Sequence, residues 1–95
     1  MSEVLVIVEV VAIRDEQAFQ DYRAQARVQG AARGVAVVGR GGHTIEGDPP
    51  YLDVMVQRWP SEQAFRDWQE SDEYRPLRDI RRRAADLRIA VVPVI

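Results

Sequence analysis

"VAVVGRGGHTIEGDPPYLDVMVQRW", residues 35 to 59, contains two apolar runs on either side of a turn rich in glycine and proline. The runs at 35–42 and 51–59 have the β-branched and alternating character of strands. Proline cannot donate to a strand ladder, and Gly-Asp-Pro-Pro is strong turn chemistry, so the loop is expected at 47–50. The stretch therefore predicts an antiparallel hairpin in the middle of the chain.

The segment before the hairpin predicts one strand and one helix. Residues 3–13, "EVLVIVEVVAI", are apolar on both faces of a strand, with Glu9 as the only interruption after Glu3. Asp15 is placed to cap a helix, and the apolar residues that follow recur at helical spacing to about Gly30.

The segment after the hairpin predicts two short helices and a final strand. Ser61 caps the first helix, and Pro76 lies early in the second, where its missing N–H costs least. "LRIAVVPVI", residues 87–95, reads as a strand. The order β-α-β-β-α(α)-β predicts an α+β, ferredoxin-like βαββαβ domain over residues 1–95, with helices on one face of a four-stranded antiparallel sheet.

Such a sheet leaves its second face uncovered, and here that face cannot be polar throughout. The first and last strands are apolar on both sides, and a large apolar surface rarely remains in contact with water. We therefore expect a homodimer in which two sheets pack face to face to form a dimeric α/β barrel.

Composition excludes several classes of function. The 95 residues carry 13 cations, all arginine, against 15 acids, so no overall basic field attracts nucleic acid. Lysine and cysteine are absent, which excludes Schiff-base and thiolate chemistry. The apolar N-terminus is too short to cross a bilayer and lacks a basic signal region. We expect a cytoplasmic protein with neither a nucleic-acid nor a membrane partner.

The predicted hairpin brings an unusual set of side chains to one face. In a regular ladder with Arg40 opposite Gln57, alternation places a cation, an acid, an amide and large apolar groups together. Apolar walls with a few polar groups are typical of a small-molecule pocket. The residues on this face are Arg40, Thr44, Tyr51, Asp53, Met55, Gln57 and Trp59.

Two interpretations of the polar residues remain open. A β-bulge at Gly41-Gly42 would turn His43 to the pocket face, where Arg40, His43 and Asp53 would form an acid–base group. Without it, Arg40 and Asp53 form a cross-strand charge pair and His43 is a hairpin residue near solvent. In a regular strand His43 and Glu46 point to opposite faces, and the chain has no second histidine, so the sequence does not support a metal site. No motif for a phosphate or cofactor is present.

Aromatic side chains from the helices face the predicted sheet. Phe65 is expected in the core. Tyr22, Trp68 and Tyr74 have polar tips that require partners when buried, so we expect them around a cavity.

Several of these features resemble a known family. They are "RGG" after a strand, "EGD" beside prolines in the turn, and "WPSEQAFRDWQESDEYRPLR" at 59–78. The chain is similar over nearly its whole length to the family catalogued as domain of unknown function 1330, of the dimeric α/β-barrel superfamily. The resemblance implies a ferredoxin-like fold that dimerises through its sheets and encloses a pocket. The superfamily includes cofactor-free monooxygenases, isomerases and haem-binding relatives, and Arg58 departs from the acidic residue expected there.

The resulting hypothesis is a homodimer that binds a small, partly apolar organic molecule without a cofactor. Its chemistry would be proton transfer, isomerisation, cyclisation or monooxygenation. Arg40 would orient a ligand oxygen, and His43 or Asp53 would move a proton. The ligand-binding residues would be Tyr22, Gln57, Trp59, Trp68 and Tyr74. The alternative is a non-catalytic dimeric ligand-binding or interaction module.

Overall fold

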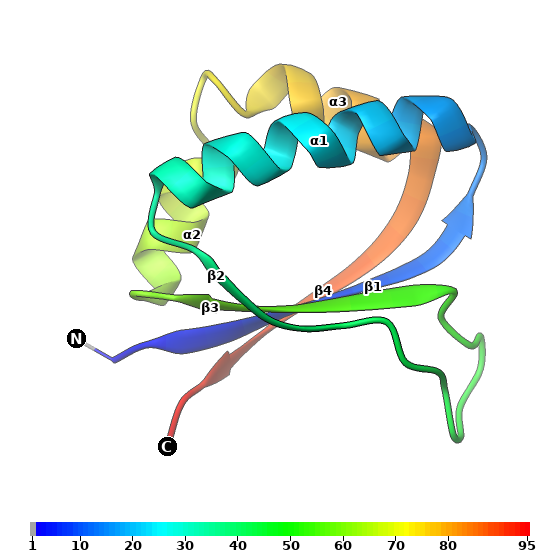
Figure 1. Ribbon diagram of the computed structural model, residues 1–95, viewed down its shortest axis with the longest axis horizontal. Helices are drawn as coiled ribbons and strands as arrows, with labels where there is room; N and C mark the ends of the chain where they lie inside the picture. Colours follow the sequence, from blue (N-terminus) through cyan, green and yellow to red (C-terminus); the bar gives the residue numbers. More distant parts are fainter. Residues whose placement is uncertain (1) are drawn as a thin grey trace.

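The computed structural model describes residues 2–95 and confirms the ferredoxin-like α+β class (Figure 1). Four antiparallel strands lie in the order β2-β3-β1-β4, and three helices cover one face of the sheet. No helix in residues 2–95 is long and apolar enough to cross a bilayer. The elements along the chain are β1 (Val4–Ile13), α1 (Glu16–Ala32), β2 (Ala36–Arg40), β3 (Asp53–Trp59), α2 (Glu62–Gln69), α3 (Arg75–Ala84) and β4 (Ala85–Pro93).

The starts of two helices follow from the predicted capping residues. The Asp15 carboxylate accepts a hydrogen bond from the Ala18 amide at 3.0 Å, and the Ser61 hydroxyl accepts one from the Ala64 amide at 3.1 Å. Each bond satisfies an amide that the helix itself leaves unpaired. At its other end α1 runs two residues beyond the predicted Gly30.

Strand β2 is shorter than predicted and differs in register. It ends at Arg40, because Gly41 and Gly42 both adopt a φ of 86°, a left-handed conformation that turns the chain out of the ladder. Arg40 pairs with Met55 instead of Gln57. The irregularity in the ladder lies between Val37 and Gly39, not at the glycine pair, and residues 41–52 form a long connection in place of a tight hairpin.

The core lies between the sheet and the helices. Val4, Val6 and Val10 of β1 are buried against it, with Trp59 from β3, and Val8 on the same side of the strand is partly buried there. This is the two-residue period of a strand with one face toward the helices. Phe65 is buried in the core as expected.

The opposite face of the sheet is apolar around its centre, and no further layer of residues 2–95 covers it. Ile7 lies at its centre, between Val56 on β3 and Ala90 on β4, and Val92 near the end of β4 is 41% exposed. The 41–52 connection leaves the sheet on this side, as Figure 1 shows in green. Arg88 joins the two by donating to the Pro49 carbonyl at 3.2 Å.

Candidate functional site

A cavity of about 500 Å³ lies between the sheet and helix α1. Its walls combine strand residues that point toward the helices with the inner face of α1. Val37 of the edge strand β2 is 50% exposed, and Arg27 of α1 and Arg40 of β2 are also exposed, so the mouth lies between these two elements. The volume is within the range typical of small-molecule sites.

A stack of aromatic rings forms part of the cavity wall. Trp59 stacks on Trp68 with ring centres 5.4 Å apart, and Trp68 meets Tyr74 at 4.4 Å. Trp59 and Tyr74 are fully buried, and Trp68 is 4% exposed. These rings supply a rigid apolar wall and fix the positions of the polar groups beside them.

Both indole N–H groups of this wall are already engaged within the protein. Trp68 Nε1 donates to the Gln29 side-chain oxygen at 3.0 Å, and Trp59 Nε1 donates to that of Gln57 at 2.9 Å. The Gln57 amide nitrogen in turn contacts the Met55 sulfur at 3.3 Å. The tryptophans therefore contribute surface to the cavity, and hydrogen bonding to a ligand must come from other groups.

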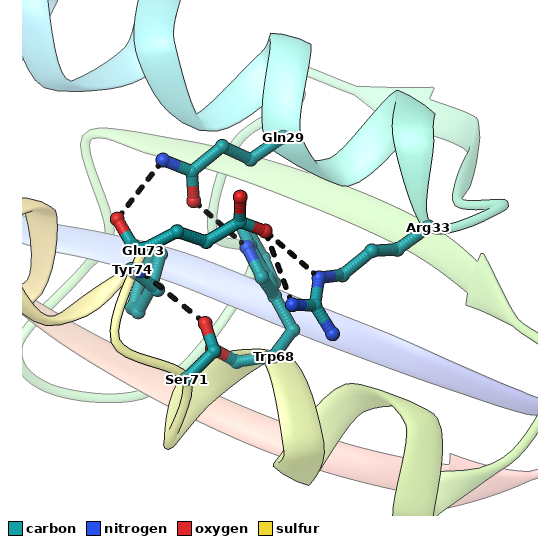
Figure 2. Close-up of polar contacts among 6 residues, drawn as sticks. All are labelled: Gln29, Arg33, Trp68, Ser71, Glu73 and Tyr74. Carbon is teal, nitrogen blue, oxygen red and sulfur yellow. Dashed lines mark hydrogen bonds and ion pairs between the residues drawn. The ribbon is translucent and has the colours of Figure 1, made fainter.

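The connection between α2 and α3 is held against α1 by a polar cluster (Figure 2). Gln29 bridges two parts of it, because its amide nitrogen also donates to the Glu73 carbonyl at 3.1 Å. Arg33 pairs with the Glu73 carboxylate at 3.1 Å, and the Ser71 hydroxyl accepts from the Tyr74 amide at 3.2 Å. The cluster positions Tyr74, which follows directly in the chain.

The Tyr74 hydroxyl is the middle of a three-residue network at the cavity. It lies 2.6 Å from the Tyr22 hydroxyl and accepts a hydrogen bond from Arg81 Nη1 at 2.8 Å. Arg81 and Tyr74 are buried and Tyr22 is partly exposed, and all three line the cavity. If Tyr74 donates its own proton to Tyr22, the Tyr22 O–H is left to donate into the cavity.

Burial raises the pKa of the Tyr22 hydroxyl well above its usual range, and the neighbouring Tyr74 adds to the shift. The nearby Arg81 acts in the opposite direction without reversing it. Tyr22 therefore remains protonated at physiological pH. It can donate a hydrogen bond to a ligand oxygen, but it is not a proton acceptor.

The structure brings most of the predicted site residues together. The cavity is lined by most of the residues assigned to the site, namely Arg40, Tyr22, Gln57, Trp59, Trp68 and Tyr74, and also by Met55. Asp53 lies at its border, where it binds Arg23 Nη2 at 2.8 Å and accepts from the Val54 amide at 2.9 Å. Each carboxylate oxygen of Asp53 therefore already accepts one hydrogen bond from within the protein.

His43 is separated from this group. It lies exposed on the 41–52 connection and lines a different hollow with Thr44, Tyr51 and Arg88, on the side of the sheet away from the helices. The bulge that would have turned His43 toward Arg40 does not form, because the chain leaves the ladder at Gly41. Arg40, His43 and Asp53 therefore do not form one acid–base group in the chain as described.

Three arginines of the cavity were not anticipated. Arg81 is the first of three consecutive arginines on the last helix, yet it is only 8% exposed. Its spacing from Tyr74 and Leu77, at 74, 77 and 81, is a helical period that places it on the inner face. Arg23 and Arg27 lie one turn apart on α1. The helical period of the sequence is therefore the signal that could have placed Arg23, Arg27 and Arg81 on the inner faces of their helices.

Comparisons with known proteins agree with this fold. The pattern of the family described as domain of unknown function (DUF1330) matches residues 3–95. No protein with a curated description matches the sequence.

Among solved structures, a protein of unknown function from Rhodopseudomonas palustris, RPA0582, superposes with a TM-score of 0.81 at 19% identity. The match covers 99% of this chain and 83% of that one. SnoaB, a cofactor-independent oxygenase from Streptomyces nogalater, superposes with a TM-score of 0.73 at 16% identity, covering 100% and 95%. At these identities the likeness establishes the fold alone.

Proposed function

This chain belongs to the DUF1330 family, and from its cavity we propose that it binds a small aromatic or enolic molecule and stabilises a negative oxygen on it, without a cofactor. One observation carries the proposal. The Arg81–Tyr74–Tyr22 network delivers a protonated hydroxyl, supported by a buried cation, to an otherwise largely apolar cavity. Donors fixed in a site of low polarity stabilise a developing oxyanion more strongly than water does.

Oxygenation is the reaction that this arrangement suits best. A phenolate or enolate held at Tyr22 is electron-rich and can pass electrons to O2. With 1-naphthol, for example, O2 would give 1,4-naphthoquinone and water, one oxygen atom entering the ring. The likeness of fold to SnoaB supports this choice, although that protein's activity is its own.

A non-catalytic ligand-binding module is the second candidate. Among the described residues, the cavity lining contains no histidine, aspartate or glutamate, so it offers no evident proton acceptor. A substrate would have to lose its proton to solvent or to Asp53 at the border.

Ligand binding is tested with 1-naphthol. We expect saturable binding to the wild-type protein by fluorescence titration and about a tenfold weaker affinity in Tyr22→Phe, which removes the donor and keeps the ring. Tyr51→Phe is the matched control, because Tyr51 lines the hollow on the other side of the sheet, and should bind as the wild type does. The absence of saturable binding would contradict the proposal.

An oxygen electrode separates the two candidates. An oxygenase would consume O2 when 1-naphthol is added. The rate of O2 consumption and the rate of 1-naphthol oxidation should then fall by the same factor in Tyr22→Phe. Binding without O2 consumption over a panel of naphthols would favour the module.

We further propose that the chain forms a homodimer through the uncovered face of its sheet. Support comes from the apolar side chains around Ile7, which would otherwise remain in contact with water. Two such faces packed together would bury them in a shared core.

A further inference from the structure

The charged residues around the cavity indicate which kind of aromatic or enolic ligand the site would bind. Four arginines line it, Arg23, Arg27, Arg40 and Arg81, and among the described residues the lining has no carboxylate. The whole chain has the opposite balance, with a net charge of −2. The positive potential is therefore local to the cavity and is not a property of the surface as a whole.

These arginines differ in how far the protein neutralises them. Arg23 pairs with Asp53 at 2.8 Å and lies over the Phe19 ring, with its guanidinium carbon 4.6 Å from the ring centre. In residues 2–95, neither Arg27 nor Arg40 forms an ion pair with a carboxylate. Both are exposed at the mouth, one on α1 and the other on β2.

We propose that the ligand is an organic carboxylate whose anionic group is held by Arg27 and Arg40 at the mouth. Its apolar body enters the cavity, and an oxygen at its far end meets Tyr22. This inference rests on the proposed function, because it assumes that the cavity is the binding site. A guanidinium matches a carboxylate in geometry as well as charge.

The proposed binding mode also explains why Arg81 is buried while Arg27 and Arg40 are exposed. Arg81 is buried and donates to the Tyr74 hydroxyl, so its charge supports the hydroxyl network, which suits an oxygen that becomes negative during a reaction. Arg27 and Arg40 face solvent and suit a group that is charged before it binds. The cavity therefore has two kinds of hydrogen-bond donor, which suit two different oxygens of one ligand.

Three probes of the same shape test the proposal by isothermal titration calorimetry. They are 6-hydroxy-2-naphthoate, 2-naphthoate, which lacks the hydroxyl group, and 6-hydroxy-2-naphthamide, which lacks the charge. We expect the hydroxynaphthoate to bind at least about tenfold more tightly than its amide at low salt. Added NaCl should weaken binding of the acid and leave the amide unchanged.

Single substitutions show which residues bind the carboxylate and which bind the hydroxyl group of the probe. Arg27→Gln and Arg40→Gln should each weaken the hydroxynaphthoate by about tenfold and leave the amide unaffected. Arg66→Gln is the matched control, because Arg66 pairs with Glu62 on α2 and does not line the cavity. Tyr22→Phe should weaken the hydroxynaphthoate but not 2-naphthoate, which locates the hydroxyl end.

The outcomes distinguish this inference from the proposed function. Equal affinity for acid and amide, or unchanged binding in both arginine variants, overturns the carboxylate proposal and leaves the ligand site intact. The failure of all three probes to bind at millimolar concentration overturns both.

Discussion

At the scale of single residues, the functional character of the cavity depends on the state of one hydroxyl group. Tyr22 shares a 2.6 Å hydrogen bond with Tyr74, and burial disfavours its ionised form. Arg81 supplies a positive charge behind this pair. A buried arginine without a carboxylate partner is costly unless hydrogen bonds compensate it, and here they come from Tyr74 and from Gln69, whose side-chain oxygen accepts at 3.3 Å.

The raised pKa of Tyr22 predicts a specific loss of stability in alkali. The unfolded chain ionises this tyrosine near its ordinary pKa of about 10, whereas the folded chain does not, so deprotonation favours unfolding. The stabilisation is complete below about pH 10 and is lost as the pH rises from there toward the folded-state pKa.

Above about pH 10 the free energy of unfolding should therefore decrease less steeply with pH in Tyr22→Phe than in the wild type. The two slopes should differ by up to about 1.4 kcal/mol per pH unit. Urea titrations of both proteins between pH 8 and 11 measure the two slopes. Identical slopes would show that Tyr22 ionises normally in the folded protein.

At the scale of elements, the α2–α3 connection determines the geometry of the inner wall. Gln29 on α1 accepts from the Trp68 indole and donates to the Glu73 carbonyl, so one side chain satisfies groups on both sides of the connection (Figure 2). The Arg33–Glu73 pair next to it is one-third to one-half exposed, and solvent screens it.

Gln29→Met should destabilise the protein by about 1–3 kcal/mol, because it keeps the length of the side chain but leaves the buried Trp68 N–H without an acceptor. Arg33→Gln should cost less than about 1 kcal/mol. Urea denaturation followed by tryptophan fluorescence measures both changes. A larger effect in Arg33→Gln would mean that the exposed ion pair, and not Gln29, holds the connection.

At the scale of the whole molecule, the two faces of the sheet have different roles. The face toward the helices encloses the cavity, and the face around Ile7 is the surface that we propose for the contact with a second copy of the chain. Residues 41–52 lie on the second side, so His43 would be close to a partner chain and far from the cavity of its own chain.

Ile7→Asp should convert the proposed dimer to a monomer or unfold it, because a carboxylate would be buried at the centre of the interface. Val28→Asp is the control, since Val28 is 71% exposed on α1. Light scattering after size exclusion measures the mass. In the wild type, the melting temperature should rise with protein concentration. A wild-type protein that is monomeric at micromolar concentration contradicts the proposed assembly.

The sequence alone was sufficient to predict the order of elements, the helix caps and the strand residues that point toward the helices. These features depend on local chemistry: capping by Asp15 and Ser61, and periods of two and 3.6 residues that mark the inner faces of strands and helices. Arg40, Gln57 and Trp59 were assigned to a common face for this reason, and the two-residue error in register did not change their side of the sheet.

Only the tertiary structure decided which distant residues meet. The Tyr22–Tyr74 contact joins positions 52 residues apart, and Arg81 reaches it from another helix, so no local pattern reveals the network. The end of β2 and the position of His43 depended on whether Gly41 and Gly42 continued the ladder or turned away from it. Glycine permits both conformations at little cost, and packing of the surrounding chain selects one.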